Sequence, residues 1–301
     1  MKRKVAKIGP STLMISLPSK WCKHFNIQKG AELELEEQGS ELKIKTESSK
    51  TSSEITIDIR DLSERTSKYL LGGTNRVGYD IINIKHNKNQ IEYLNKLFKD
   101  IYLGFIISEQ LSENTVFKKI SQESEEELDS ILRRAFLVTL NLSEIVTKKI
   151  KENKFNELKD SLALEQTTNQ LTDHCHRLLI KFGYKNYTKT SFLYIISWNL
   201  EKIADEYKSI INNLNNSRIN KDLVNFLEEI HEIFQEYYNL YYNFSIDKLD
   251  EKISKIKKFK ERIDKYENNL NKDEIFLYTH ILKIATRLSD FSSSFLGANL
   301  M

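Results

Sequence analysis

Proline distribution constrains this chain more than any other feature of its sequence. Its 301 residues include only two prolines, Pro10 and Pro18. Proline interrupts a helix because it lacks a backbone N–H and its ring clashes with the preceding turn. With so few glycines as well, the chain after residue 18 is free to form long helices. We therefore expect a mainly α-helical, multidomain protein, with any β-structure concentrated near the N-terminus.

The region from residue 119 to 301 has the apolar periodicity of amphipathic helices. Leu128, Leu132, Ala135 and Phe136, for example, recur at three- and four-residue spacing, which places them on one helical face. The periodicity predicts six helices, at about 122–151, 154–182, 188–215, 219–244, 246–270 and 272–298. We interpret the whole region as one helical domain.

A short internal sequence repeat divides that helical domain into two halves. The segment Leu-Glu-Lys-Ile-Ala-Asp at 200–205 is matched by Ala-Thr-Arg-Leu-Ser-Asp at 285–290, an offset of 85 residues. This offset predicts two tandem three-helix bundles, at about 122–215 and 219–300. Glu201 and Asp205, four residues apart, share one helical face, and like charges there cost energy unless a cation neutralises them.

The first thirty residues have an unusual charge pattern. They contain seven Lys or Arg and no Asp or Glu, whereas residues 31–46 introduce several acids. Residues 1–50 carry a net charge of +4, and the remainder carries −1. A basic half joined to an acidic half in one small module indicates a face for nucleic acid.

Residues 1–48 are predicted to form a small β-module. Short alternating strands flank a turn at Gly9-Pro10, Pro18-Ser19 is expected to open a short helix, and two further strands surround Gly39. Four strands and one helix of this size cannot bury enough surface alone, so we expect an obligate dimer. The residues expected to pack across its two-fold axis are Leu33, Leu35, Leu42 and Ile44.

Between these two domains we expect a polar linker, Glu47–Glu54, and a small α/β connector at 54–118. Alternating isoleucines predict a strand at 55–59, and a helix at 62–71 is expected to end at Gly72-Gly73. A strand at 77–84, a helix at 91–100 and a strand at 101–108 follow. The connector lacks the Lys-Ser/Thr of a phosphate-binding loop, so we assign it a structural role.

The N-terminal module resembles the AbrB/SpoVT (MazE-like) swapped-hairpin family. The resemblance covers residues 3–46 and is carried by Lys-Ile-Gly-Pro-Ser at 7–11, Ile-Ser-Leu-Pro at 15–18, Ile-Gln-Lys-Gly at 27–30 and Gly-Ser-Glu-Leu-Lys-Ile at 39–44. Pro10 stands where the family usually has Asn or Asp. The resemblance implies a dimeric, strand-swapped barrel whose basic face lies on double-stranded DNA. The expected DNA-binding residues are Lys2, Arg3, Lys4, Lys7, Ser11 and Lys20.

The helical domain resembles the PhoU family, whose two three-helix bundles repeat an E/D-x-x-x-D signature. The match is strongest at Glu201 and Asp205, while Asn169 stands where the family prefers Asp and Thr286 where it prefers Glu. The resemblance implies a bound metal (iron, zinc, manganese or magnesium). Its expected ligands are Glu165, Asn169, Glu201, Asp205 and Asp290. The fusion of the two modules also resembles a group of archaeal phosphate-uptake regulators.

The residues leave alternatives to the metal site open. The acids of the signature can instead pair with bases such as Arg177 or Lys202. The run Asp-His-Cys-His at 173–176 contains ligand types, but we interpret it as polar helix surface with Cys175 packed inside. No nucleophile, metalloprotease or C-x-x-C motif is present, so we do not expect an enzyme.

Two further features bear on location. Two cysteines, Cys22 and Cys175, are too few for a disulfide framework and fit a reducing compartment. We find no signal peptide and no apolar run of spanning length, so we expect a cytoplasmic protein without membrane insertion.

The sequence is compatible with two functions. The first is a DNA-binding transcriptional regulator of phosphate uptake that dimerises through its N-terminal domain and senses a signal through its helical domain. The second is an adaptor that does not bind DNA. In that case the N-terminal barrel only dimerises the chain, and the helical domain docks on phosphate transporter components or a signalling partner.

Overall fold

The computed structural model describes residues 2–45, 53–214, 219–266 and 270–300. It separates the chain into two compact units, Met1–Ser52 and Ser53–Met301. Most of the predicted linker, from residue 47 to 52, lies outside the described residues. The second unit contains both the predicted connector and the predicted helical domain.

The first unit consists of two hairpins and a short helix. β1 (Ala6–Ile8) pairs with antiparallel β2 (Thr12–Met14), and β3 (Glu34–Gln38) pairs with antiparallel β4 (Glu41–Lys45). α1 (Ser19–His24) lies between the hairpins in sequence. Pro18 occupies its N-cap position, and no described side chain caps this helix with a hydrogen bond. The described residues of one chain form two separate two-stranded sheets and no closed barrel.

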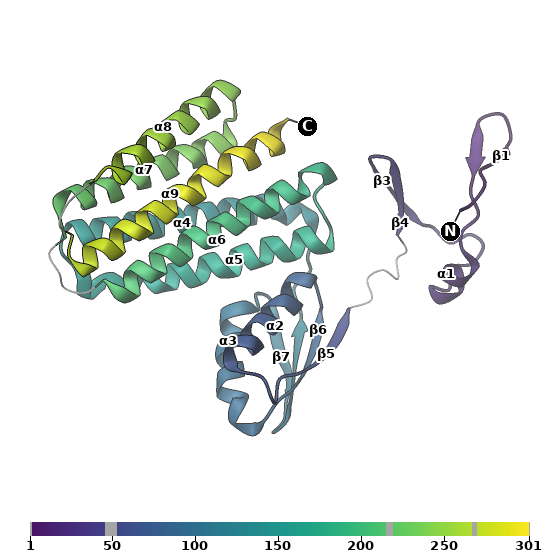
Figure 1. Cartoon of the computed structure of the whole chain (residues 1–301). Coiled ribbons are helices and arrows are strands. Elements are labelled where there is room, and N and C mark those ends of the chain that lie inside the picture. The colour runs from purple at the N-terminus through teal and green to yellow at the C-terminus, as the bar shows by residue number, and fades with distance from the viewer. Residues whose placement is uncertain (1, 46–52, 215–218, 267–269, 301) are drawn as a thin grey trace. The chain divides into compact units, whose positions relative to one another are not determined.

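The second unit opens with a four-stranded sheet in the order β5-β6-β8-β7, formed by β5 (Glu54–Asp58), β6 (Ile81–Lys85), β7 (Phe105–Gln110) and β8 (Asn114–Lys119). β5 and β6 are parallel, and β8 is antiparallel to both of its neighbours. Because crossovers between parallel strands are right-handed as a rule, two crossovers that step in the same direction across a sheet place their helices on one face. Those helices, α2 (Glu64–Val77) and α3 (Ile91–Ile101), pack against each other (Figure 1).

The predicted helix break at Gly72-Gly73 is wrong. α2 continues through both glycines to Val77 and ends at Gly78, whose φ of 103° is the left-handed conformation of a helix C-cap. Consequently the expected strand at 77–84 begins later, at Ile81, and the strand expected at 101–108 begins at Phe105. β8, which lies inside the sheet, was not predicted.

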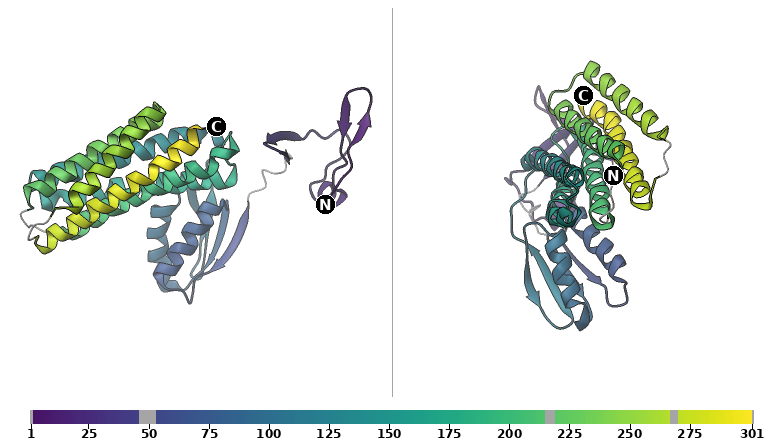
Figure 2. Two further views of the ribbon diagram at one scale, coloured as in Figure 1. Left: turned by 45° about the horizontal axis from the view of Figure 1, so that its top comes forward. Right: turned by 90° about the vertical axis from the view of Figure 1, so that its left-hand side faces the viewer.

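Six long helices are confirmed, but the first two begin at Leu128 and Leu162, later than the predicted 122 and 154, and the fifth ends at Asp264 rather than at 270. They are α4 (Leu128–Lys151), α5 (Leu162–Lys181), α6 (Thr190–Asn213), α7 (Lys221–Tyr242), α8 (Ile246–Asp264) and α9 (Lys272–Asn299). Asn220, Ser245 and Asn271 each accept a backbone N–H at a helix start, as N-cap residues do. Figure 2 shows the six helices running alongside one another.

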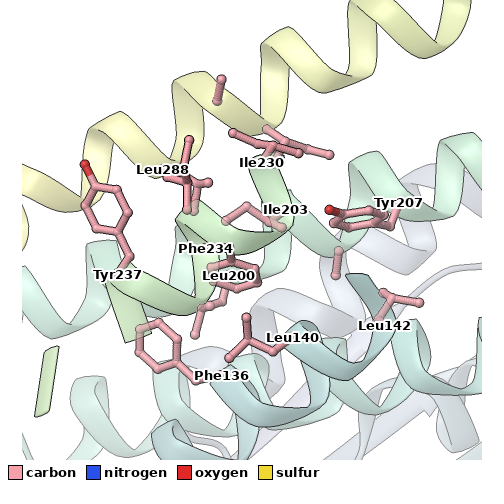
Figure 3. Packing of buried hydrophobic residues seen from close by; sticks show 14 of the residues in the cluster. Phe136, Leu140, Leu142, Leu200, Ile203, Tyr207, Ile230, Phe234, Tyr237 and Leu288 are labelled. Carbon is pink, nitrogen blue, oxygen red and sulfur yellow. The ribbon is translucent and has the colours of Figure 1, made fainter. Parts of the chain in front are cut away.

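The six helices share one hydrophobic core. α4, α5 and α6 pack together, as do α7, α8 and α9, and the two groups meet where α6 packs on α9 and α4 on α7. Figure 3 shows this junction, with Phe136 of α4, Leu200 of α6, Phe234 of α7 and Leu288 of α9 all buried. The two copies of the internal repeat, at 200–205 and 285–290, thus lie on two helices that pack against each other. Among the described residues, no helix is long and apolar enough to cross a membrane.

Candidate functional site

The predicted DNA-binding residues are all exposed. Lys7 lies in β1, Ser11 in the turn that follows, and Lys20 in the first turn of α1. Lys2, Arg3 and Lys4 precede β1. None of these five cations forms an ion pair with another described residue, so their charges remain available to an anionic partner. Each predicted DNA-binding residue is therefore accessible to solvent in a single chain.

A pocket of 590 Å³ lies between the connector and the helical bundle, with walls from α2, α3, α5 and α6. Four of the five predicted metal ligands line it: Glu165, Asn169, Glu201 and Asp205. The fifth, Asp290, does not. It lies on α9, where its carboxylate is 3.7 Å from Arg287. The predicted ligands on α5 and α6 thus line the pocket, whereas Asp290, from the second half of the repeat, does not.

The three predicted carboxylate ligands in this pocket already have cationic partners. Lys208 lies 2.9 Å from Glu165, which also accepts a 2.6 Å hydrogen bond from Asn169. Lys202 lies 2.9 Å from Asp205 and 3.3 Å from Glu201. Lys202 is therefore a partner of these acids, as one alternative proposed. Arg177, the other base considered, pairs with different acids.

Arg76, which the sequence analysis did not consider, supplies a further cation to the same pocket. It comes from the last turn of α2, and its Nε lies 2.6 Å from Asp173 Oδ1, while its Nη2 lies 3.5 Å from Glu201 Oε1. Lys68, Gly72 and Arg76 are spaced four residues apart and all line the pocket, as expected for one helical face. The four-residue spacing can be recognised in the sequence. The predicted helix break at Gly72-Gly73, however, placed Lys68 and Arg76 on different elements.

The interpretation of residues 173–176 as polar surface is wrong. Cys175 is buried as expected, but Asp173, His174 and His176 are buried as well. Burial raises the pKa of Asp173 to about 6; the nearby Glu201 also raises it, and Arg76 opposes this. Burial lowers the pKa of His176 to about 3, so its imidazole is neutral at physiological pH. The ring stacks on Tyr194, with centroids 4.2 Å apart.

Asp173, His176 and Glu201 together have the donor types of a metal site. One donor atom from each lies within 4.8 Å of the others, and neither ring nitrogen of His176 has a hydrogen-bond partner among the described residues. A neutral imidazole and two carboxylates are ligands that Zn²⁺ accepts. However, the Arg76 guanidinium contacts both carboxylates and already supplies them with a positive charge.

A second charged cluster joins the same two parts of the unit. Arg177 of α5 is fully buried, and its guanidinium contacts Glu123 and Asp80. Lys181, one helical turn further along α5, also contacts Asp80, at 2.7 Å. Because every charge in this cluster faces a charge of opposite sign, it fixes the connector against α5 and thereby sets the position of the pocket walls.

Comparisons with protein-family models, with curated proteins and with solved structures found no match to this chain. The function of this chain is therefore inferred from its own residues. Those residues define two candidate sites: a basic face on the small β-rich unit, and a charged pocket at the junction of a four-stranded sheet domain with a helical bundle.

Proposed function

We propose that this protein is a DNA-binding transcriptional regulator, in which the small N-terminal unit dimerises on DNA and the larger unit receives a signal. The observation that carries the proposal is the run of thirty residues with seven cations and no acid, whose predicted contact residues are all exposed. Unpaired Lys and Arg side chains on one small module suit the closely spaced phosphates of duplex DNA.

Self-association through the same unit is supported by the absence of a buried core among its described residues. No described side chain of residues 2–45 is buried in a single chain, and Leu13, Leu35 and Val5 are 60–69% exposed. A module of this kind gains a core when a second copy covers its apolar faces. A dimer would also present the basic segment twice, which increases the number of phosphate contacts.

We propose phosphate uptake as the regulated process, because the fusion of the two modules resembles phosphate-uptake regulators. A DNA-free adaptor would use the same dimer but would not need a free basic face. Exposed cations that pair with no described acid therefore favour the regulator.

A salt titration of binding to the DNA upstream of its own coding sequence tests the proposal. If Lys2, Arg3, Lys4 and Lys7 of both protomers contact DNA, about six to eight phosphates are neutralised and the logarithm of affinity falls with log salt by about 0.9 per contact. The Arg3→Ala/Lys4→Ala variant should bind every sequence more weakly and show a shallower slope.

The matched control is Lys257→Ala/Lys258→Ala, which removes the same charge from the exposed face of α8. This control should bind DNA as the unmodified protein does. Equal affinity of the Arg3→Ala/Lys4→Ala variant and the unmodified protein at every salt concentration would favour the adaptor.

A further inference from the structure

His176 of α5 is a buried imidazole whose ring nitrogens have no hydrogen-bond partner in the described chain. The residue is 0% exposed, and neither Nδ1 nor Nε2 forms a hydrogen bond with a described residue. Buried polar groups in proteins are nearly always hydrogen-bonded, so these nitrogens indicate a partner from outside the chain. A neutral imidazole with a free lone pair is a common metal ligand.

Two carboxylates lie next to this imidazole. A ring nitrogen of His176, a carboxylate oxygen of Asp173 and one of Glu201 lie within 4.8 Å of one another. Glu201 Oε2 is itself buried and has no hydrogen-bond partner among the described residues. Asp173 and His176 are three residues apart on α5, which places them on one helical face, and Glu201 comes from the adjacent α6. This donor set suits a metal cation better than an anion.

The ligand set that the resemblance to the PhoU family implies fits these contacts less well. Asp290 lies outside the pocket, and Glu165 and Asp205 each have a lysine partner at 2.9 Å. Asn169 contributes an unpartnered buried oxygen, but its amide is neutral and adds no charge to hold a cation. The contacts of the described residues therefore favour a ligand set that includes His176.

Arg76 opposes a cation at this cluster. Its guanidinium contacts Asp173 and Glu201, and it would repel a divalent ion bound by the same carboxylates. Arg76 compensates their charge only in part, because burial still raises the pKa of Asp173 to about 6. The cluster belongs to the bundle, whereas Arg76 belongs to α2 of the connector. A bound ion and the contact of α2 with the bundle through Arg76 therefore disfavour each other.

From these observations we infer that Asp173, His176 and Glu201 bind a divalent transition-metal ion, with Arg76 as an intramolecular competitor. Asp173 and Glu201 line the pocket, which gives an ion access to them. The imidazole favours Zn²⁺ or a similar ion over Mg²⁺ and Ca²⁺, which prefer oxygen ligands. Coupling between two binding events is reciprocal, so withdrawal of Arg76 raises the affinity for the ion, and the ion weakens the contact of Arg76 with the bundle.

The inference deepens the proposed function, because it names a metal ion as the signal that the larger unit receives. It rests on that function only for the effect of the ion on DNA binding. Binding of the ion is a property of α5 and α6, and its competition with Arg76 is a property of their contact with α2. Both can be measured without DNA.

The affinity of the full chain for Zn²⁺, measured by competition with a chelating dye, tests the ligand set. In the Arg76→Met background, His176→Phe keeps an aromatic ring beside Tyr194 but removes both nitrogens, and it should weaken binding about tenfold or more. Asp173→Asn, which changes the side-chain volume very little, should do the same. His174→Phe is the matched control, because His174 is also buried on α5 but lies outside the cluster. It should leave the affinity unchanged, and thermal melting checks that each variant is folded.

Two substitutions of Arg76 test the competition. Arg76→Met removes the positive charge and should raise the affinity for Zn²⁺ about tenfold or more, within the usual range of coupling between sites. Arg76→Lys keeps a positive charge and should bind Zn²⁺ nearly as weakly as the unmodified protein does. Equal gains in both variants would show that the shape of the side chain matters and not its charge, which would overturn the competition.

The inference is also overturned if Arg76→Met binds Zn²⁺ no more tightly than the unmodified protein. The same holds if His176→Phe or Asp173→Asn leaves the affinity of the Arg76→Met protein unchanged. Glu165→Gln removes a ligand of the implied set, and if it weakened binding as much as His176→Phe does, the assignment of the ligands would be wrong.

A separate measurement distinguishes this result from DNA binding. The Arg3→Ala/Lys4→Ala variant should bind Zn²⁺ as the unmodified protein does, because its substitutions lie in the other unit. Normal Zn²⁺ affinity in a variant that no longer binds DNA would leave the metal assignment intact. If the unmodified protein failed to bind DNA, the Zn²⁺ titrations would still decide the assignment.

Discussion

Arg177 of α5 donates a 2.8 Å hydrogen bond from Nε to Oε1 of Glu123, and the Arg177 side chain is completely buried. The other two guanidinium nitrogens of Arg177 also donate hydrogen bonds. Nη1 donates to the carbonyl oxygens of Asn75 and Tyr79, at 3.0 and 2.8 Å, and Nη2 donates to the Asp80 carboxylate. One side chain of the bundle thereby holds the C-terminal end of α2, the start of β6 and the segment before α4.

Replacing Arg177 with Met should therefore destabilise the larger unit strongly. The substitution leaves the buried Glu123 carboxylate and the partly buried Asp80 carboxylate with fewer cations. Removing one partner of a buried ion pair costs about 3–5 kcal/mol. Urea unfolding measures the loss. Arg262→Met is the control, since Arg262 is 55% exposed in its pair with Glu229 and such pairs contribute up to about 1 kcal/mol. Equal effects of the two substitutions would contradict the role of Arg177.

The same cluster predicts a dependence of stability on pH. Burial alone would raise the pKa of Glu123, but hydrogen bonds from Arg177 and Lys119 outweigh burial and lower it from 4.5 to about 2. Because the folded-state pKa is the lower one, the stabilisation by Glu123 is complete above about pH 4.5 and is lost as the pH falls toward 2.

Comparing Glu123→Gln with the unmodified protein isolates this contribution. The variant should be less stable at pH 7, by about 3 kcal/mol, and the difference should shrink steadily between pH 4.5 and pH 2. Glu126→Gln, an exposed neighbour in the same segment, should show no such difference. A gap between Glu123→Gln and the unmodified protein that stays constant down to pH 2 would exclude a lowered pKa at Glu123.

Metal binding at the pocket should depend on Arg76. Its guanidinium lies against Asp173 and Glu201, so Arg76→Met would leave two carboxylates available to a cation. The ring nitrogens of His176, which have no hydrogen-bond partner among the described residues, would be available as well. We expect the affinity for Zn²⁺, measured by competition with a chelating dye, to rise at least tenfold in this variant. Adding Glu201→Ala should remove the gain, because it deletes one of the three ligands.

Arg65→Met serves as the control for Arg76→Met, because Arg65 lies on the same helix and contacts Tyr69 outside the carboxylate cluster. Elemental analysis of the unmodified protein, purified without chelator, completes the test. Stoichiometric metal in that protein would show that Arg76 does not compete for the site, and the metal predicted at Glu165, Asn169, Glu201 and Asp205 would then be supported.

Dimerisation should depend on the exposed leucines of the β3–β4 hairpin. Leu35 and Leu42 are 61% and 52% exposed in a single chain, and charges introduced there would have to be buried in a dimer. Leu35→Glu/Leu42→Glu should therefore sediment as a monomer at a concentration where the unmodified protein is a dimer. Leu111→Glu, at a 55% exposed site in the larger unit, should not change the sedimentation. Residues 1–50 alone should also form a folded dimer, and a folded monomer would contradict the swapped-hairpin prediction.

The amino-acid sequence by itself determined the long helices and the local arrangement within each of them. Helical periodicity in a region without proline is a local property, so the six helices could be located to within a few residues of most boundaries. The spacing of Glu201 and Asp205 likewise placed them on one face of α6 before any tertiary contact was known. The charge pattern of the first thirty residues is equally local, and it predicted an exposed basic face.

Only the tertiary structure decided which charges meet. Arg76 and Asp173 are 97 residues apart, and no periodicity within either helix indicates that α2 packs on α5. The Gly72-Gly73 pair was misinterpreted because the intrinsic cost of glycine in a helix is about 1 kcal/mol per residue, which packing of α2 against α3 and α5 can offset. The burial of residues 173–176 is likewise a result of tertiary packing. Whether a polar residue on a helix faces water or other protein atoms depends on what packs against that face; here Arg76 of the connector contacts Asp173, and Tyr194 of α6 stacks on His176.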